Sequence, residues 1–345
     1  MTNTLFCSSI DQEKFFEYEF DSVIINNFSI KNDDGPVMQI PGETYLFQTH
    51  SAFGHSLMDI YGQFKILQLK YKNIKPFFYE THEGYFNQNK VTIDQMSFLG
   101  YKDSEVFNIS VGNYSFEKII MFFDMNLTFP QDFYSSNGAT RSLQYFPFCT
   151  CFAGGGNGQL ACGQSEYFKY NYLAIDILKE NFKEFYNNKK EENIFVSRQR
   201  FNNFRKWQIE FYSNKDVLSE KDKGDYAFAK WRYCEKEDSI QKKFEDNGWK
   251  IVCPEDYSLI EQIKIFSSAK NIAGTSGTWI FHSFWGNEET NIFEISAIPN
   301  HRYHYKEFAD YAGVNHSYIN VVDLSEEDTL SLLQKNIDKI NKKEG

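Results

Sequence analysis

The sequence of 345 residues lacks an excess of basic charge and has no clusters of Lys and Arg. It carries 36 Lys and Arg against 47 Asp and Glu, which gives a formal net charge of −11. A chain with this balance offers no basic stripe that could follow a phosphodiester backbone. We therefore predict that nucleic acid is not a partner.

Long apolar runs are also missing. The first 20 residues contain early acidic residues and neither a basic segment nor a continuous apolar stretch, so they do not resemble a signal peptide. No run elsewhere approaches the length that spans a bilayer. The sequence thus predicts a cytoplasmic protein without a transmembrane segment.

Cysteine is scarce, with six residues spread along the chain. Cys149, Cys151 and Cys162 lie close together, which leaves a zinc site as one interpretation. They lack the paired Cys-x-x-Cys spacing and the adjacent His of most zinc sites. Reduced, buried thiols are the interpretation that we favour, and we predict no bound metal.

The length exceeds that of a typical single hydrophobic core, which favours two α/β domains with a cleft between them. A run of charged and polar residues, from Asn188 to Glu192, is typical of a domain boundary. We place the two domains at residues 1–188 and 189–345.

The second domain alternates regularly between strand and helix patterns, which predicts a parallel sheet with helices on both faces. Capping boxes, Ser258 with Glu261 and Ser325 with Asp328, mark two helix starts. The stretch 203–224 has no clear pattern, and we expect an irregular insertion there. The predicted strands cover 193–196, 249–253, 271–273 and 291–295, and the predicted helices cover 236–246, 259–269 and 279–285.

The strongest local signal is a short apolar strand that ends in a turn of Gly, Ser and Thr before an apolar segment. Gly274 and Gly277 would let the backbone approach a ligand, while Thr275, Ser276 and Thr278 add hydroxyl groups. In doubly wound sheets, phosphates bind where such strands end. The alternative is a plain tight turn that caps the next helix.

Arginine follows the first strand of the same domain. Ser197 and Arg198 come directly after that strand, at the edge of the sheet where the glycine turn should also lie. A guanidinium group at this edge would neutralise a diphosphate. Arg200, Arg205 and Arg232 are candidates for the same task, and solvated surface positions are the alternative for each.

A possible proton acceptor occurs in the first domain. A Pro41-Gly42 turn precedes a predicted strand at 44–47, and a helix is predicted near 56–71. His55 and Asp59 are four residues apart, hence on one face of the first turn of this helix.

The ordered set of these motifs resembles glycosyltransferase family 61, which includes xylosyltransferases, O-linked N-acetylglucosaminyltransferases and bacterial capsular polysaccharide enzymes. The resemblance covers about residues 45–70 and 193–320. The motifs that carry it are Phe53-Gly54-His55-x-x-x-Asp59, Val196-Ser197-Arg198, Arg232 with Glu235, Gly248-Trp249-x-Ile251-Val252-x-Pro254-Glu255, Gly274-Thr275-Ser276-Gly277-Thr278 and Phe293-Glu294-Ile295.

This resemblance implies a GT-B fold of two Rossmann-like domains, the first on the acceptor side and the second binding the donor. It implies an inverting transfer from a nucleotide sugar, usually a UDP-sugar, with neither a metal nor another cofactor. No Asp-x-Asp metal motif occurs in the chain, which agrees with that implication. The residues that it places at the donor are Ser197, Arg198, Arg232, Gly274, Thr275, Ser276, Gly277, Thr278 and Glu294.

For catalysis, the resemblance implies that His55 or Asp59 removes the proton of the acceptor hydroxyl. Histidine has a pKa suited to this step, so we favour His55 as the base and Asp59 as its support. A purely structural role of His55 at the helix start is the alternative.

The expected acceptor is a hydroxyl of a glycan or lipid-linked glycan in the synthesis of a capsule or another surface polysaccharide. A lipid-linked acceptor would bring the protein into peripheral contact with the cytoplasmic face of a membrane. The alternative function is a non-catalytic protein that binds a carbohydrate or nucleotide at a degenerate transferase site.

Overall fold

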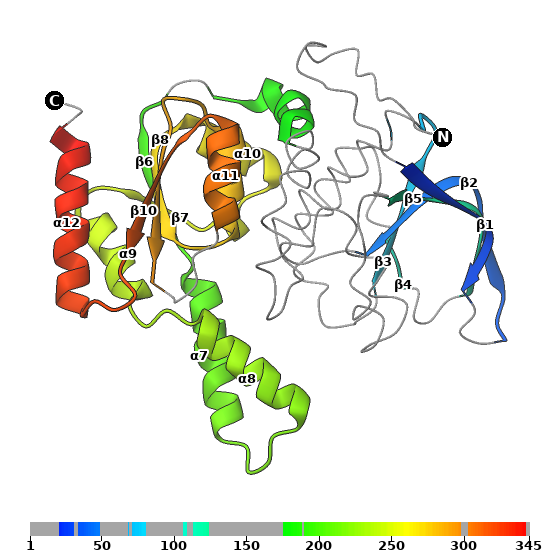
Figure 1. Ribbon diagram of the computed structural model, residues 1–345, viewed down its shortest axis with the longest axis horizontal. Helices are drawn as coiled ribbons and strands as arrows, with labels where there is room; N and C mark the ends of the chain where they lie inside the picture. Colours follow the sequence, from blue (N-terminus) through cyan, green and yellow to red (C-terminus); the bar gives the residue numbers. More distant parts are fainter. Residues whose placement is uncertain are drawn as a thin grey trace. The chain divides into compact units, whose positions relative to one another are not determined.

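The computed structural model of the chain describes residues 21–30, 34–48, 68, 71–80, 106–108, 113–123, 175–187, 190–297 and 303–342. The chain divides into two compact units, Met1–Asn181 and Phe182–Gly345. Each unit contains a five-stranded sheet (Figure 1). His55 and Asp59 lie outside the described residues, as do the three clustered cysteines.

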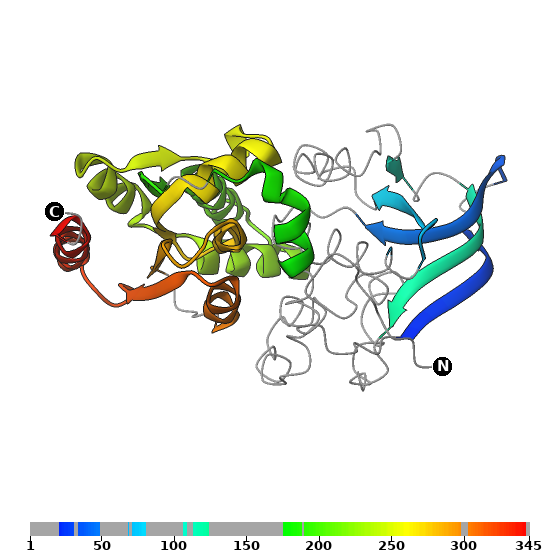
Figure 2. The same ribbon diagram turned by 90° about the horizontal axis from the view of Figure 1, so that it is seen from above.

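The sheet of the first unit is mixed, with strand order β1-β5-β2-β3-β4. Its edge strand β1 is antiparallel to β5, and the other neighbouring pairs are parallel. Figure 2 shows β1, β2 and β5 as long curved strands. The strands are β1 (Asp21–Ile30), β2 (Val37–Gln48), β3 (Lys75–Glu80), β4 (Val106–Asn108) and β5 (Asn113–Phe123).

The predicted strand at 44–47 lies within β2, but the predicted turn before it is wrong. The strand runs through Pro41-Gly42, and its register against β5 shifts between Ile40 and Glu43. Gly42 has a φ of 82°, a conformation that glycine adopts at little cost. The pair therefore forms a bulge in a continuous strand.

The sheet of the second unit is entirely parallel, with strand order β10-β9-β8-β6-β7. The predicted alternation of strand and helix and the predicted parallel sheet are confirmed. The strands are β6 (Glu192–Val196), β7 (Lys250–Val252), β8 (Ala269–Thr275), β9 (Asn291–Ser296) and β10 (Asn315–Asn320).

Helices cover both faces of this sheet (Figure 1). On one face, α9 (Glu237–Asp246) and α12 (Glu326–Lys342) pack against each other and against the strands. The other face carries α10 (Leu259–Ser268), the 3₁₀ helix η7 (Thr278–Trp285) and α11 (Tyr303–Ala312). Short 3₁₀ helices, η5 (Lys183–Phe185) and η6 (Pro254–Asp256), lie in the connections.

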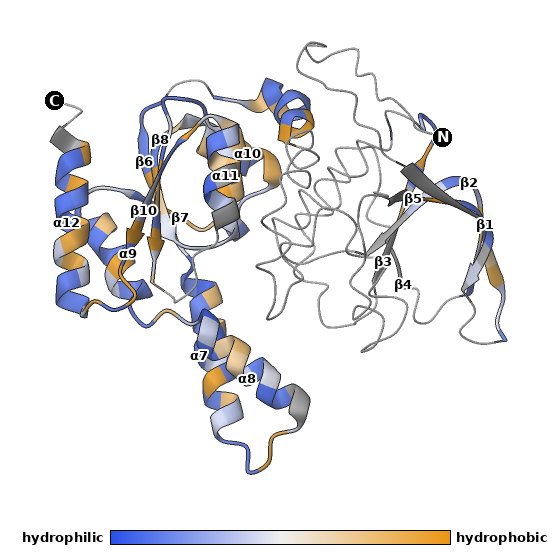
Figure 3. Cartoon of the chain, in the orientation of Figure 1, coloured by the Kyte–Doolittle hydropathy of each residue, from blue (hydrophilic) through white to orange (hydrophobic). Residues whose placement is uncertain are grey.

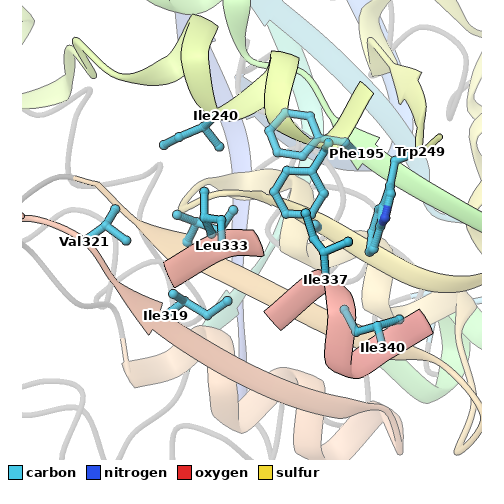
Figure 4. Close-up of a cluster of buried hydrophobic side chains, with 11 residues drawn as sticks. Phe195, Ile240, Trp249, Ile319, Val321, Leu333, Ile337 and Ile340 are labelled. Carbon is cyan, nitrogen blue, oxygen red and sulfur yellow. The ribbon is translucent and has the colours of Figure 1, made fainter. Parts of the chain in front are cut away.

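The core beneath α9 and α12 combines aromatic and branched side chains from the sheet and both helices (Figure 4). Phe195 of β6 stacks on Phe244 of α9 with ring centroids 4.8 Å apart. Leu333 and Ile337 of α12 close the cluster and are fully buried. Burial of such side chains stabilises the fold by roughly 1.5–3 kcal/mol each, so this core fixes the sheet relative to α9.

The predicted capping box of Ser258 and Glu261 is present, and Ser325 caps the start of α12 as predicted. Ser258 accepts a hydrogen bond from the backbone of Glu261, whose carboxylate accepts one from Ser258 N at 2.8 Å. Ser325 accepts from Asp328 N at 3.1 Å and thereby starts α12. These local signals place the helix starts as the sequence predicts.

The prediction of an irregular insertion at 203–224 is wrong. The chain forms a helical hairpin of α7 (Gln199–Ser213) and α8 (Glu220–Arg232). A capping box of Ser219 and Asp222 starts α8. The sequence pattern hides α7 because several of its aromatic side chains are exposed, so no buried apolar stripe marks the helix.

The apolar segment at 279–285 is helical, as predicted, but it forms a 3₁₀ helix. Every side chain from Trp279 to Trp285 is buried. Because protein surrounds this segment on all sides, its apolar residues are not confined to one face, as they are in an amphipathic surface helix. Among the described residues, no helix combines the length and apolar character needed to cross a membrane.

Candidate functional site

The strand order of the second unit reverses between β6 and β8, because β7 lies outside β6 while β9 and β10 continue beyond β8. In open parallel sheets, ligands bind at the carboxyl ends of the strands beside such a reversal. Ser197 and Arg198 follow β6, and the turn at Ser276 and Gly277 follows β8. The topology therefore brings the two predicted segments together.

Arg198 lies directly on the glycine turn. Its Nη1 donates a hydrogen bond to the backbone oxygen of Ser276 at 2.5 Å. A Cβ added to Gly277 would lie 3.0 Å from Arg198 Nε and 3.1 Å from its Cζ. Gly277 has an extended backbone that any residue adopts, with φ −179°. A side chain at position 277 would therefore require Arg198 to shift from its present position.

Glu237, in the first turn of α9, joins the two segments. Its Oε2 accepts a hydrogen bond from Thr275 Oγ1 at 2.7 Å, and its Oε1 accepts one from Arg198 N at 3.3 Å. Burial raises the pKa of this carboxyl group, and the nearby charge of Arg198 opposes that rise. Sequence reasoning missed Glu237 because an acidic residue in a first helical turn is common.

The predicted hydroxyl groups support the turn from within the protein. Ser197 Oγ donates to Gln241 Oε1 at 2.5 Å, and Ser276 Oγ donates to the backbone oxygen of Ile295 at 3.4 Å. Together with Thr275 they are buried. Their contacts hold the backbone of both strand ends in place.

Trp279 fixes the turn from below. Its indole nitrogen donates to the Thr275 backbone oxygen at 2.6 Å. A Cβ added to Gly274 would lie 3.0 Å from the Trp279 ring, so this glycine permits close packing of ring and strand. Thr278 is the first residue of η7 and follows directly on the turn.

Three arginines surround one aromatic ring at the start of α7. The guanidinium carbons of Arg198, Arg205 and Arg232 lie 4.8, 4.6 and 5.7 Å from the centroid of Phe201. The hairpin brings Arg232, the last residue of α8, back to this ring. Three of the four predicted arginines thus lie near the carboxyl end of β6.

The fourth candidate, Arg200, forms an ion pair with Asp256 at 2.5 Å. Both side chains are largely exposed, so this pair contributes little to stability. Arg200 is therefore engaged with η6 rather than with the cluster around Phe201.

Glu294 faces the opposite side of the sheet. Ile295 belongs to the core beneath α9, so its neighbour Glu294 points toward the other face because strand side chains alternate. Glu294 Oε2 lies 3.0 Å from His316 Nε2, and both side chains are almost fully buried. Its carboxylate pairs with His316 rather than with Arg198. The role of Glu294 in donor binding stays a prediction.

Within the described residues, no three His, Cys, Asp or Glu side chains gather in a way that would hold a metal ion. Cys234 is a buried thiol whose pKa burial raises to about 12, so it is not reactive near neutral pH.

The sequence profile of glycosyltransferase 61 matches residues 53–293, which is more than half of the chain. The chain belongs to glycosyltransferase family 61. No curated protein matches it significantly. The matched span starts in the predicted motif of His55 and includes both strand ends that carry Arg198 and Gly277. Membership of this family indicates glycosyltransferase activity.

Proposed function

We propose that this family 61 protein is an inverting glycosyltransferase of the GT-B type. It transfers a sugar from a UDP-sugar to a hydroxyl of a glycan or lipid-linked glycan in the synthesis of a surface polysaccharide. Residues 189–345 bind the donor, and residues 1–188 supply the acceptor side and the base. Family membership and the arginine-lined edge of the parallel sheet support this proposal.

The apposition of Arg198 and Gly277 at the reversal of the sheet carries the proposal. As the bond between the sugar and the diphosphate breaks, negative charge develops on the oxygen that joined the anomeric carbon to the β-phosphate. A fixed guanidinium group stabilises that charge. The gathering of Arg205 and Arg232 near Arg198 places further positive charge at the same strand end. Like charges collected in this way favour binding of an anion.

In the proposed reaction, His55 removes the proton from the acceptor hydroxyl. The resulting oxygen nucleophile forms a bond to the anomeric carbon from the side opposite to the diphosphate. The bond from that carbon to the diphosphate oxygen breaks, and UDP leaves with the electron pair. Asp59 orients His55 and stabilises its protonated form. Because arginine stabilises the negative charge of the leaving UDP, the transfer needs no divalent metal.

Titration of UDP into the protein, followed by calorimetry, tests the donor site. Gly277→Val should lower the affinity at least about tenfold, because its side chain displaces Arg198 and removes a charge-assisted contact of roughly 1.5–3 kcal/mol. Gly224→Ala is the matched control, since a Cβ at Gly224 meets nothing within 4 Å. Equal UDP affinity of the folded Gly277→Val variant and the wild type would remove this turn from the donor site.

A further inference from the structure

The start of α9 holds the corner between β6 and α7. Three successive residues of this corner, from Ser197 to Gln199, each form a hydrogen bond with a different side chain of α9. Their partners are Gln241, Glu237 and Asp238, in that order. Glu237 differs from the other two because it is only 1% exposed. A buried carboxylate therefore lies against the backbone of the middle residue, Arg198.

Glu237 binds two strand ends, one with each of its carboxylate oxygens. One oxygen accepts the backbone N–H of Arg198 after β6, and the other accepts the hydroxyl of Thr275, the last residue of β8. Because β6 and β8 are neighbours, a single side chain spans the edge on which the proposed donor site lies. A side chain without acceptors at this position would leave two donors unpaired.

The contact with Glu237 leaves the guanidinium group of Arg198 without a carboxylate partner. Among the described residues, the Arg198 side chain contacts the backbone oxygen of Ser276 and the ring of Phe201, and no Asp or Glu forms an ion pair with it. A guanidinium group has five N–H donors, so one carbonyl contact leaves most of them for an anion. Glu237 thus holds the main chain of Arg198 and does not compete for its charged group.

In the sequence, the whole α7–α8 hairpin lies between Arg198 and Glu237. Figure 3 shows this hairpin extending away from the sheet of its unit and returning toward it. Two hydrogen bonds between Asn202 and Cys234 close its base, shortly before α9 begins. The chain therefore returns to the strand end from which it left, and the first turn of α9 meets Arg198 across 39 residues.

We infer, on the basis of the proposed donor site, that Glu237 is a positioning residue that orients Arg198 toward the diphosphate. It fixes the backbone of Arg198 relative to Thr275, so the guanidinium group loses little entropy when the phosphates bind. Glu237 does not touch the donor, because it is buried and both of its oxygens are engaged. A carboxylate with a structural role alone would affect stability and leave the UDP affinity of the folded protein unchanged.

Calorimetric titration of UDP into two variants at position 237 tests this role. Glu237→Gln keeps an acceptor for the Arg198 N–H and can donate to the Thr275 hydroxyl, so its UDP affinity should stay within about threefold of the wild type. Glu237→Met has a similar size and no such acceptor, so its affinity should fall at least about tenfold as Arg198 loses its orientation. Both variants remove the same charge, and the difference between them isolates the hydrogen bonds.

Glu245→Met is the matched control, because it makes the same exchange at an exposed position in the last turn of α9. It should bind UDP as the wild type does. Combining Glu237→Met with Arg198→Ala tests whether Glu237 acts through Arg198. Without the arginine side chain, Glu237→Met should lower the affinity by less than about twofold. If Glu237→Met does not fold, Glu237→Asp replaces it. This side chain is too short to reach both partners and should lower the affinity at least about fivefold.

Three results in folded variants would overturn the inference: wild-type UDP affinity of Glu237→Met, an equal loss in Glu237→Gln and Glu237→Met, or the same loss with and without Arg198. Inorganic pyrophosphate separates these results from a failure of the proposed function. If the wild type binds pyrophosphate but not UDP, and Glu237→Met binds it more weakly, the positioning role stands and a UDP donor is rejected. If the wild type binds neither ligand, both are rejected.

Discussion

Contacts with neighbouring residues hold both the side chain and the backbone of Arg198 in place. Its side chain rests on Phe201 and on the turn at Gly277, and its backbone N–H is bound by Glu237. In the proposed donor site, a guanidinium group that is already fixed loses little entropy when the donor binds, which makes its charge more effective. A side chain at position 277 would force Arg198 to shift from these contacts.

The central catalytic prediction concerns a single residue, His55. His55→Ala should lower turnover by roughly two to four orders of magnitude, as expected for the loss of a general base, with little change in donor affinity. Steady-state kinetics and UDP calorimetry measure the two effects separately. Asp59→Asn is the companion variant. A larger loss with Asp59→Asn would make Asp59 the base, and near-normal turnover of both folded variants would leave the motif a structural role.

At the scale of single elements, Asn202 joins the base of the α7–α8 hairpin. Its side chain is buried and forms two hydrogen bonds of 2.8 Å, one to the backbone oxygen and one from the backbone N–H of Cys234. Cys234, the second residue after α8, is thereby tied to the first turn of α7. This pairing keeps Arg232 near Phe201.

Asn202→Leu should lower the free energy of unfolding by about 2–4 kcal/mol, because both backbone groups of Cys234 lose their partner. Urea denaturation measures the change. Asn203→Ala, at the exposed neighbouring position, should change it by less than about 0.5 kcal/mol. Equal stability of Asn202→Leu and the wild type would mean that these hydrogen bonds do not hold the hairpin.

The 3₁₀ helix η7 contains His282, a buried imidazole that stacks on Phe266 at 3.8 Å between centroids. Its Nδ1 accepts a hydrogen bond from Trp285 Nε1 at 3.2 Å, which requires that nitrogen to be unprotonated. Burial lowers the pKa of His282 from 6.5 to about 3. In the folded protein this histidine is therefore neutral above about pH 3.

This depressed pKa makes stability depend on pH. Below pH 6.5 the unfolded chain binds a proton at His282 that the folded chain does not bind, down to about pH 3. Its contribution to stability should thus decrease by up to about 1.4 kcal/mol for each pH unit below 6.5. In His282→Gln, which keeps an acceptor for Trp285, the decline between about pH 6.5 and 5 should be shallower by this amount. An unchanged slope in urea denaturation would contradict a neutral buried His282.

For the whole molecule, the sequence predicts the architecture of the second unit from alternation alone. Apolar runs such as 193–196 and 271–273 are typical of buried parallel strands, and they became β6 and β8. β10 was not predicted, because its residues are mostly exposed and polar. The hairpin escaped prediction for a related reason, since exposed aromatic rings break the usual pattern of a one-sided helix.

The candidate site could also be predicted from the sequence only in part. That Arg198 and Gly277 lie at one edge of the sheet could be predicted, because the carboxyl ends of parallel strands share an edge. Their contact could not, since it depends on β6 and β8 being neighbours with β7 outside them. The contacts of Glu237 with Arg198 and Thr275 could not be predicted either, because they depend on the same strand order. Glu294, which sequence similarity groups with the donor, lies on the other face with His316.

The most direct test of the whole account is the release of UDP from a panel of UDP-sugars, measured by chromatography with EDTA present. We expect slow UDP release from one donor by the wild type, faster release when its acceptor is added, and a marked decrease for Arg198→Ala. Absence of UDP release from every donor would indicate a binding protein with a degenerate site. Release only after Mn²⁺ or Mg²⁺ is restored would contradict leaving-group stabilisation by arginine.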